Sequence, residues 1–329
     1  MAQIQPSSGA QYARLMSVGG ARGSRVVDNA EICTMIDSTD EWIRQRTGIV
    51  ERRWADENET PLTLAVEASR KAIERAGITP DQVGAVICST ISHFKQTPSL
   101  ACEVARELGC AEPAAFDISA ACAGFAYGVA MAESMVRAGQ ATYVLTIGVE
   151  ALSWMLDMED RSTAFLFSDG AGAAIVGPSD VPAMGPVVWG SAPEQTEVIS
   201  IDSWSDVDPG TNPKIHMDGK KVFRWATTYI AEKTHEALAK AGLQPEELDV
   251  FIPHQANNRI TDSMLRHLKL PEKVVVARDI VQMGNSSAAS VPLAMEALLE
   301  SGDAKSGQTA LIIGFGAGLV FAGQVVTLP

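Results

Sequence analysis

The sequence has few cysteines and no pattern that would pair them. Five occur among 329 residues, an odd number without CxxC spacing, which argues against a disulfide framework and a structural zinc site. We therefore expect reduced thiols in a cytoplasmic protein with no bound metal. The five are Cys33, Cys88, Cys102, Cys110 and Cys122.

Basic residues are outnumbered. Lys and Arg total 26 against 40 Asp and Glu, a formal net charge of −14, so the molecule as a whole repels polyanions and nucleic acid is not an expected partner. Any anionic ligand must meet a local basic patch.

Long apolar runs are also missing. The first twenty residues do not resemble a secretory signal, and the charge-free stretch 306–329 is broken by glycines into TALIIGF and LVFAGQVVTL. These two pieces predict buried strands joined by a glycine turn, not a membrane helix. With 46% hydrophobic residues, the composition excludes disorder and allows about two domains.

The chain repeats itself. AIERAGITPDQVGAVI at 72–87 matches ALAKAGLQPEELDVFI at 237–252, which lies 165 residues later. Two further pairs keep the order: AMAESMVRAG from Ala130 with AMEALLESG from Ala294, and ATYVLTIG with TALIIG, which end at Gly148 and Gly314. A duplicated domain is the economical interpretation.

The sequence pattern of each repeat predicts a helix, a turn and a continuous apolar strand. This alternation predicts mixed sheets covered by helices. Turn residues gather in GPSDVPAMGP, so we place the boundary there and expect two α/β halves, 1–178 and 179–329. Equivalent loops of the two halves should meet near the pseudo-symmetry axis, where ligand sites commonly form.

Cys122 is the first candidate for chemistry. It follows an expected strand at 115–118 and enters a helix that runs towards Gly139. A helix N-terminus favours a thiolate, so we expect a lowered pKa and an accessible sulfur among small neighbours. The alternative is a buried, inert cysteine, the reading given to the other four.

His254 is the second candidate, in FIPHQANNRI after the strand of the second repeat, where the first repeat has Ser89. A lone histidine is more often a packed or surface residue, but Gln255, Asn257 and Asn258 make an unusual polar cluster here.

Asn285 in QMGNSSAAS occupies the loop equivalent to that of Cys122, with Ser286 opposite the cysteine by the 164-residue offset. The alternative for this asparagine is a turn or N-cap residue. GFGAG at 314–318 could bring backbone N–H groups to a ligand oxygen, although it lacks a dinucleotide spacing.

Together these motifs resemble one family. AACAGF around Cys122, PHQANNRI around His254 and GNSSAAS around Asn285 resemble the Cys-His-Asn set of β-ketoacyl-acyl-carrier-protein synthase III, and STDEWIRQRTGI, FSDGAGAA, VFRWA and GFGAG follow in the family's order. The resemblance spans the chain. It implies a thiolase-like duplicated fold, layered αβαβα, in a homodimer that needs no cofactor because acyl-CoA is a substrate.

The resemblance also implies a mechanism. Cys122 would attack an acyl-CoA primer, and malonyl-acyl carrier protein would then decarboxylate to an enolate held by His254 and Asn285. The backbone N–H groups of Cys122 and Ala317 would form the oxyanion hole. Ala317 stands where the family commonly has glycine, which we expect to be harmless if its φ is negative.

The residues that would bind CoA and the carrier protein are inferred only from alignment with the family. Trp42 and Arg161 resemble a pair that sandwiches the adenine of CoA, and Arg46 resembles a phosphate contact. A solvated arginine is the alternative in each case. The acidic carrier protein would dock on a basic patch at positions matched by Arg224, Arg259 and Arg266.

Thr97 in KQTPSL aligns with a pocket residue that some relatives fill with phenylalanine. A smaller residue leaves more room, so we expect primers larger than acetyl, such as branched or longer acyl-CoAs.

Related classes differ at identifiable positions. Elongating ketosynthases have a second histidine where Asn285 stands, and thiolases need a cysteine near the C-terminus, whereas no cysteine follows Cys122 here. Chalcone synthases share the Cys-His-Asn set, but AACAGF and PHQAN fit the bacterial initiating enzyme better. Three readings stay open: priming of fatty acid synthesis, a priming ketosynthase or acyltransferase of an aromatic polyketide pathway, and a non-catalytic acyl-CoA binding module.

Overall fold

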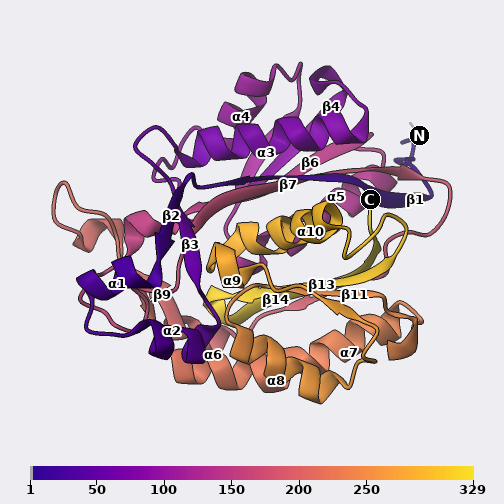
Figure 1. Cartoon of the computed structure of the whole chain (residues 1–329). Coiled ribbons are helices and arrows are strands. Elements are labelled where there is room, and N and C mark those ends of the chain that lie inside the picture. The colour runs from indigo at the N-terminus through magenta and orange to yellow at the C-terminus, as the bar shows by residue number, and fades with distance from the viewer. Residues whose placement is uncertain (1–2) are drawn as a thin grey trace.

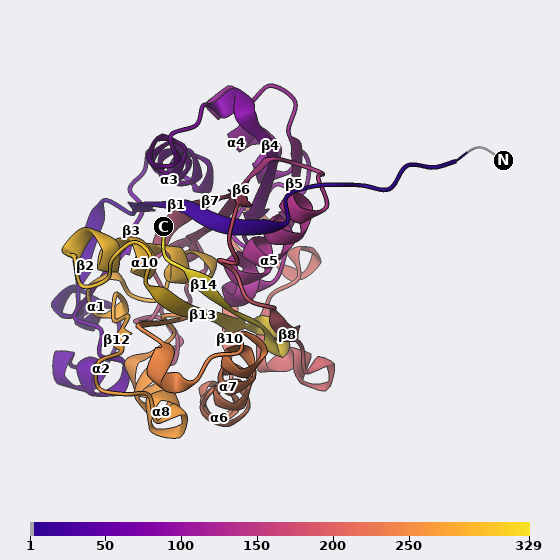
Figure 2. The ribbon, with the colours of Figure 1, turned by 90° about the vertical axis from the view of Figure 1, so that its right-hand side faces the viewer.

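The computed structural model describes residues 3–329 and stacks them in five alternating layers of helix and sheet (Figure 1). Helices α3 and α4 cover one sheet, helices α5 and α10 lie between the two sheets, and helices α6 to α8 cover the other sheet (Figure 2). The predicted αβαβα sandwich is confirmed. The helices are α3 (Pro61–Ala76), α4 (Leu100–Leu108), α5 (Gly124–Arg137), α6 (Gly219–Trp225), α7 (Ala231–Lys240), α8 (Asn258–Leu268) and α10 (Ser290–Ser301).

The two sheets repeat one topology. The first has the order β1-β7-β6-β4-β5 and the second the order β12-β11-β13-β14-β8, each with parallel strands on one side and antiparallel strands on the other. The strands of the first are β1 (Tyr12–Arg22), β4 (Val83–Ser89), β5 (Ala114–Ile118), β6 (Tyr143–Ala151) and β7 (Asp169–Ser179). Those of the second are β8 (Val188–Gly190), β11 (Val250–Pro253), β12 (Val275–Val276), β13 (Thr309–Gly316) and β14 (Val320–Thr327).

The chain passes from the first sheet to the second between Ser179 and Val188. This change lies next to the predicted division at 178/179, which itself stays a prediction. The two pieces of the charge-free C-terminal stretch are the antiparallel neighbours β13 and β14, as the glycine pattern predicted. No helix within residues 3–329 has the length and apolar character needed to cross a membrane.

Local sequence explains the matched helix ends. Thr60 caps α3 through its side chain, Pro61 occupies the first turn, and Gly77 ends the helix with a φ of 68°. Gly242 takes the same left-handed conformation after α7, with a φ of 76°. Because left-handed backbone costs glycine little, both repeats place a glycine where the helix must turn into the next strand.

The central helices bury apolar residues against both sheets. Phe125 and Val129 of α5 pack with Val291 and Met295 of α10 in one core cluster that reaches strands of both halves. Close backbone contacts also join the halves: a Cβ placed on Gly148 of β6 would lie 2.2 Å from the carbonyl oxygen of Ala288. The two halves therefore share one interior.

A buried carboxylate adds a polar contact between the halves. Glu296 of α10 is 2% exposed and accepts hydrogen bonds from the backbone N–H of Gly20 at 2.7 Å, from Arg22 at 2.9 Å and from Arg75 at 3.0 Å. Three donors, two of them charged, satisfy a carboxylate that would otherwise be costly to bury. Its partners all belong to the N-terminal half.

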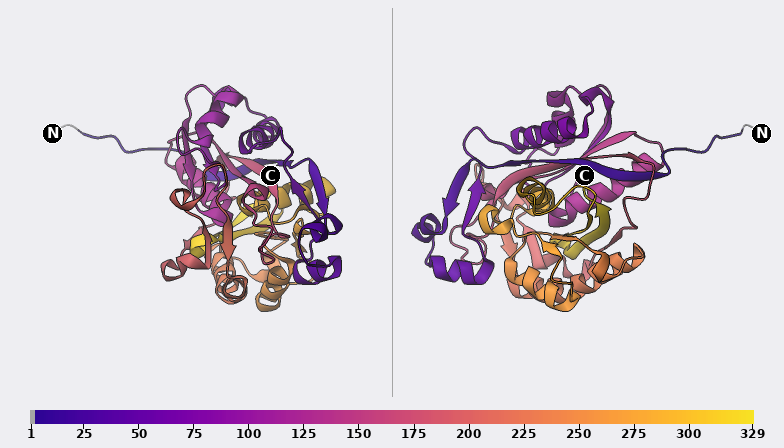
Figure 3. Two further views of the ribbon diagram at one scale, coloured as in Figure 1. Left: turned by 90° about the vertical axis from the view of Figure 1, so that its left-hand side faces the viewer. Right: turned by 45° about the vertical axis from the view of Figure 1, so that its right-hand side comes forward.

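Smaller elements stand beside the layers at one end (Figure 3). The strands β2 (Arg25–Asp28) and β3 (Glu51–Trp54) pair antiparallel and carry α1 (Asn29–Met35) and α2 (Asp40–Thr47) between them. A second antiparallel pair is formed by β9 (Ile199–Ile201) and β10 (Ile215–Met217). A short helix, α9, spans Ile280–Met283. The β9–β10 pair and helix α2 line a cavity, whereas no residue of β2 or β3 does.

Candidate active site

Cys122 lies where the sequence predicted it, between a strand and a central helix. After β5, a short 3₁₀ turn (Ala121–Ala123) leads into α5, and Ala121 takes a positive φ of 43°. Gly316 of β13 lies directly against the cysteine, because a Cβ there would be 3.0 Å from Sγ and 2.9 Å from the backbone nitrogen. Only glycine fits this contact without displacing the sulfur.

The predicted lowering of the Cys122 pKa is wrong. Cys122 is only half-buried, but loss of hydration in the cavity raises its pKa to about 12, and a hydrogen bond with the Ser287 side chain opposes this only in part. Loss of hydration disfavours the thiolate more than these donors favour it. The resting side chain is a neutral thiol, so its proton must leave as the sulfur attacks.

The other four cysteines differ in exposure. Cys88 is fully buried, whereas Cys102 on α4 is exposed, so the expectation of burial is wrong for Cys102. Burial raises the pKa of the Cys88 thiol well above its usual range.

His254 follows β11 and is 3% exposed. Its Nδ1 lies 2.7 Å from the hydroxyl oxygen of Ser290, the first residue of α10, and that oxygen also accepts the backbone N–H of Gln255 at 3.3 Å. Because the Ser290 oxygen accepts a hydrogen bond from the N–H of Gln255, the Ser290 hydroxyl can donate its own proton to Nδ1 of His254. The ring then carries its own proton on Nε2. Burial lowers the pKa of His254 to about 3, so the ring is neutral.

Asn285 is held by backbone on both sides. Its N–H donates to the carbonyl of Leu166 at 3.0 Å, and its carbonyl accepts from Ser168 at 2.9 Å. The side-chain oxygen Oδ1 accepts the N–H of Ser287 at 2.9 Å. This bond fixes the amide orientation and leaves the Nδ2 group to donate into the cavity.

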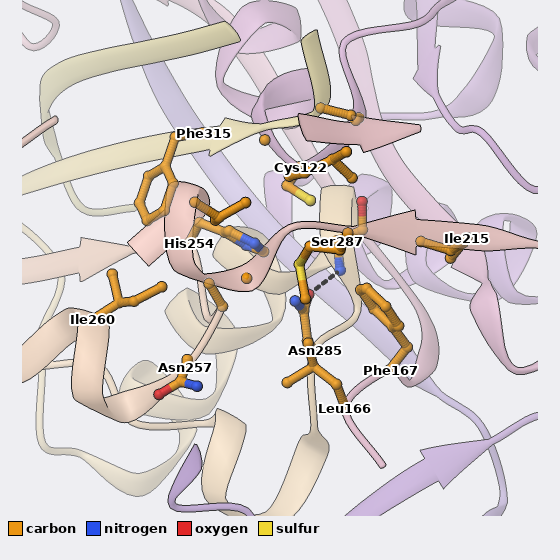
Figure 4. A pocket seen from close by; sticks show the side chains of 18 of the residues that line it. Cys122, Leu166, Phe167, Ile215, His254, Asn257, Ile260, Asn285, Ser287 and Phe315 are labelled. Carbon is orange, nitrogen blue, oxygen red and sulfur yellow. Dashed lines mark hydrogen bonds between the residues drawn. The ribbon is translucent and has the colours of Figure 1, made fainter. Parts of the chain in front are cut away.

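These three side chains meet in one cavity of about 960 Å³, although Cys122 and Asn285 lie 163 positions apart in the sequence. Figure 4 shows the sulfur of Cys122, the ring of His254 and the amide of Asn285 directed towards a common space. Apolar groups surround them, among them Phe167 and Phe315, and the ring of Phe315 lies edge to face with His254 at 5.3 Å. A nucleophile therefore faces two neutral hydrogen-bond donors in a largely apolar pocket.

The predicted backbone donors also lie at the cavity. Ala317 lines it immediately after Gly316, beside Cys122. Within residues 3–329, the non-glycine residues with positive φ are Ala121, Lys269, Ser287 and Leu319. Ala317 is not one of them, so an alanine fits the backbone at this position. Its role in an oxyanion hole stays a prediction.

Two of the three residues predicted to bind CoA border the cavity. Trp42 and Arg46 on α2 both line it, and the guanidinium of Arg46 lies 5.4 Å from the centre of the Trp42 ring. Arg161 does not line it and pairs with Asp37 at 3.3 Å. Arg46, not Arg161, is thus the cation next to Trp42, and the Trp42–Arg161 sandwich stays a prediction.

The three arginines predicted to dock the carrier protein are all exposed, and α6 and α8 carry them. Arg259 borders the cavity and its guanidinium lies 5.6 Å from the ring of Phe223. Arg224 on α6 and Arg266 on α8 stand outside the cavity lining. The predicted helix after His254 is confirmed as α8, which packs beside the α6 region (Figure 1).

Thr97 is exposed and is not among the residues that line the cavity of its own chain. Ile91, in the same loop after β4, does line it. The assignment of Thr97 to the primer pocket stays a prediction.

Three polar residues of the site were not predicted from the sequence. Ser287 hydrogen-bonds to Cys122, Ser290 to His254, and the buried Glu150 of β6 contacts Ser287 at 3.4 Å. A signal for Glu150 existed, because it is the one charged residue in the strand YVLTIGVEA. The symmetry alignment also needs correction: the 3₁₀ turns before α5 and α10 begin at Ala121 and Ser287, so Ala288, not Ser286, lies opposite Cys122.

Comparison with known proteins agrees with this geometry. Residues 116–193 match the family model described as 3-oxoacyl-[acyl-carrier-protein] synthase III, and residues 238–328 match its C-terminal counterpart. The chain is 57% identical to "Beta-ketoacyl-[acyl-carrier-protein] synthase III" of Streptomyces glaucescens over the full length of both proteins. A mycobacterial β-ketoacyl-[acyl-carrier-protein] synthase III, of Mycobacterium marinum, is 47% identical and covers 100% of this chain and 99% of its own.

Solved structures show the same architecture. The priming β-ketosynthase of the R1128 polyketide pathway superposes with a TM-score of 0.96 at 45% identity, covering 100% of this chain and 99% of its own. The 3-oxoacyl-(acyl carrier protein) synthase III of Pseudomonas aeruginosa PAO1 gives 0.90 at 34% identity, with 97% and 99% covered. The predicted thiolase-like fold is confirmed, and the chain belongs to the 3-oxoacyl-[acyl-carrier-protein] synthase III family of condensing acyltransferases.

Proposed function

We propose that the protein condenses an acyl-CoA primer with malonyl-acyl carrier protein and so initiates fatty acid synthesis. The observation that carries this proposal is the convergence of Cys122, His254 and Asn285 on one apolar cavity. A thiol can accept an acyl group there, and two neutral donors can stabilise an enolate without being ionised. Because the thiol must stay reduced, we place the reaction in the cytoplasm.

The first half-reaction transfers the acyl group. The CoA thioester enters past Trp42 and Arg46, the carbonyl carbon reaches Sγ of Cys122, and the backbone N–H groups of Cys122 and Ala317 stabilise the oxyanion. The C–S bond to CoA then breaks. This leaves an acyl-enzyme and free CoA, with no resident cofactor required.

The second half-reaction forms the carbon–carbon bond. Malonyl-carrier protein loses CO₂, and the negative charge that develops on the thioester oxygen is stabilised by the Nε2 proton of His254 and by Nδ2 of Asn285. The enolate carbon attacks the acyl group on Cys122. Phe167 and Phe315 keep the surroundings apolar, which strengthens both hydrogen bonds.

The carrier protein would dock at Arg224, Arg259 and Arg266. These exposed cations are clustered on α6 and α8, and Arg259 stands at the cavity itself. Their charge contrasts with the −14 of the whole chain. An acidic partner is therefore attracted to this face more than to the rest of the surface.

The homodimer implied by the sequence is supported by one open strand. β5 is an edge strand of the first sheet, paired on one side to β4. Its residues Phe116 and Ile118 are only half-buried, and an uncovered apolar edge invites pairing with a second copy. Sedimentation velocity distinguishes the two states, and a monomer at micromolar concentration would refute this assembly.

A threonine at position 97 would leave more room for the primer than phenylalanine, whereas the cavity of about 960 Å³ extends from Cys122 to Trp42 and Arg46 and must hold the CoA arm as well. We propose that branched or longer acyl-CoAs are accepted. Initial rates with isobutyryl-CoA and acetyl-CoA test this, and a strict preference for acetyl-CoA would contradict it.

Intact-protein mass spectrometry tests the function directly. The protein is mixed with acetyl-CoA or isobutyryl-CoA and then with malonyl-carrier protein. We expect one acyl group on the wild type, none on Cys122→Ala, and discharge into a ketoacyl-carrier protein. Binding of acyl-CoA without any covalent adduct on wild type would instead support a non-catalytic binding module.

The alternative is a priming ketosynthase or acyltransferase of an aromatic polyketide pathway. This alternative is supported by the high similarity of the chain to the priming β-ketosynthase of the R1128 pathway. Competition between carrier proteins of the two pathways in the same assay separates these roles. Transfer of the acyl group without release of CO₂ would identify the acyltransferase.

A further inference from the structure

Glu150 is a buried carboxyl group that the mechanism above does not use. It lies in β6 with no measurable exposure, in a strand that is otherwise uncharged. Within the described chain its hydrogen-bond partners are the side chains of Thr90, Ser92 and Ser287 and the backbone of Ile91. None of these partners is charged. A carboxyl group without a cation is costly to bury as an anion.

The two oxygens of Glu150 have different surroundings. Oε2 accepts hydrogen bonds from the Ser92 hydroxyl at 2.6 Å, the Ile91 N–H at 3.1 Å and the Thr90 hydroxyl at 3.4 Å. Oε1 faces only the hydroxyl of Ser287, at 3.4 Å. Because the donors gather on Oε2, a proton on the carboxyl group belongs on Oε1, facing Ser287.

Ser287 lies between Glu150 and the nucleophile. Its hydroxyl donates to Oε1 of Glu150, and the same side chain is the hydrogen-bond partner of Cys122, so its oxygen can accept the thiol proton. Its backbone takes a positive φ of 48°, which is uncommon for a serine, and its N–H is held by Oδ1 of Asn285. A strained conformation that the neighbours fix in place is typical of functional sites. The hydroxyl is thereby held between a carboxyl group and a thiol.

We propose that Glu150 takes up the proton that Cys122 releases on acylation and returns it to the sulfur after condensation, with the Ser287 hydroxyl as the relay. This inference rests on the proposed function. Ser287 touches the reacting sulfur and is a catalytic residue, whereas Glu150 acts through Ser287.

The steps balance over one turnover. As Sγ bonds to the acyl carbon, the thiol proton passes to Oγ of Ser287, whose own proton passes to Oε1 of Glu150. The C–S bond to CoA breaks, and the CoA thiolate takes a proton from water. When the enolate attacks, the acyl–Sγ bond breaks and leaves the Cys122 thiolate. The proton then returns from Oε1 through Ser287 to the sulfur, so each turnover consumes one solvent proton.

The acid–base properties of the neighbours agree with this path. Burial raises the pKa of Glu150 to about 7, so the carboxyl group can exist in both forms near neutral pH. His254, with its pKa lowered by burial to about 3, cannot store the proton. The other titratable groups that interact with Glu150 in the described chain are Cys122 and Cys88. Burial keeps both as neutral thiols.

The test compares Glu150→Gln and Ser287→Ala with wild type in single-turnover acylation by acyl-CoA. For wild type we expect the acylation rate to rise with pH up to about 7 and then level, because the carboxylate form is the proton acceptor. Each variant should lose about 10²-fold in rate, with the KM for acyl-CoA unchanged, and the pH 7 step should vanish. Ser89→Ala is the matched control, since the buried Ser89 hydroxyl has no hydrogen-bond partner within the described residues, and it should behave as wild type.

The outcomes separate the two proposals. If wild type forms no acyl-enzyme with any acyl-CoA, the proposed function fails. If wild type reacts but both variants keep its rate and its pH profile, the relay is wrong and the proposed function stands. If Glu150→Gln fails to fold, Ser287→Ala decides alone, because it removes one oxygen and leaves the carboxyl group in place.

Discussion

The two halves of the molecule build the same backbone and give it different chemistry. In each half a 3₁₀ turn whose first residue has a positive φ leads into a central helix, at Ala121 before α5 and at Ser287 before α10. The first turn carries the nucleophile Cys122, whereas the second has Ala288 at that place. Duplication thus supplied two equivalent frames, and only one became reactive.

A second matched pair lies beside these turns. In the first half Ser89 ends β4 and lies so close to Gly124 that a Cβ there would be 1.6 Å from its Oγ. In the second half His254 follows β11 and bonds to Ser290, which is equivalent to Gly124. A pair of small residues in close contact therefore lies on one side of the axis, and a hydrogen-bonded pair lies on the other.

We expect the largest loss of activity when the nucleophile is removed from the first half, and no recovery when a cysteine is placed at the equivalent position of the second half. Cys122→Ala should lower condensation by more than about 10⁴-fold, because no acyl-enzyme forms. Adding Ala288→Cys should restore nothing, since Ala288 is 1% exposed and does not line the cavity. Steady-state release of CoA measures both variants. Recovery in the double variant would show that the frames are interchangeable.

Alkylation tests the difference in reactivity between the half-buried Cys122 and the exposed Cys102. A pKa of about 12 leaves Cys122 about 10³-fold poorer in thiolate than an ordinary thiol near neutral pH, and this fraction rises with pH. Iodoacetamide at pH 8 should therefore label the exposed Cys102 first. Peptide mass spectrometry reports each site, and equal labelling of Cys122 would contradict the raised pKa.

Replacing His254 with the residue of the other half tests the enolate donors. His254→Ser should lower decarboxylation by about 10²- to 10³-fold, because one of two donors is lost. Acylation of Cys122 should persist, which mass spectrometry detects. Loss of the acyl adduct instead would assign His254 to the first half-reaction.

Ser290→Gly makes the second helix entrance resemble the first. Without its hydroxyl, Nδ1 of His254 loses its partner and the ring is no longer fixed with its proton on Nε2, so decarboxylation should fall about tenfold. Ser290→Thr keeps the hydroxyl and should rescue most of the rate. Equal rates for both variants would remove Ser290 from the mechanism.

The smallest effect concerns the surface of the second half. Arg259→Ala should raise the KM for malonyl-carrier protein several-fold and leave that for acyl-CoA unchanged, because a rim charge acts mainly on association. Arg106→Ala on α4, an exposed arginine of the first half, is the control. Equal effects of both substitutions would mean that only net charge matters.

Motifs and periodicity predicted much of the molecule. The repeat predicted the duplicated layers, because helices and apolar strands have distinct local patterns. Cys122, His254 and Asn285 could be named because each follows a strand in an unusual polar or small-residue context. Only the folded structure shows that these three side chains lie in one cavity.

The network behind the cysteine could not be predicted. Glu150 and Ser287 are 137 positions apart, and no local pattern records that they touch. The pKa of Cys122 was predicted in the wrong direction for a related reason: the helix N-terminus is visible in the sequence, but the depth of burial is a property of the packed molecule. The place of Ser287 relative to Cys122 depended on a two-residue shift that the helix alignment did not reveal.

The buried Glu296 and the contact between Gly148 and Ala288 bear on how this molecule could evolve and unfold. Each half completes the interior of the other, so neither can open as a rigid lobe or survive as a separate folding unit. A descendant of this duplication cannot discard one copy and keep the other. Because the halves share one interior, we expect them to unfold together and not one after the other.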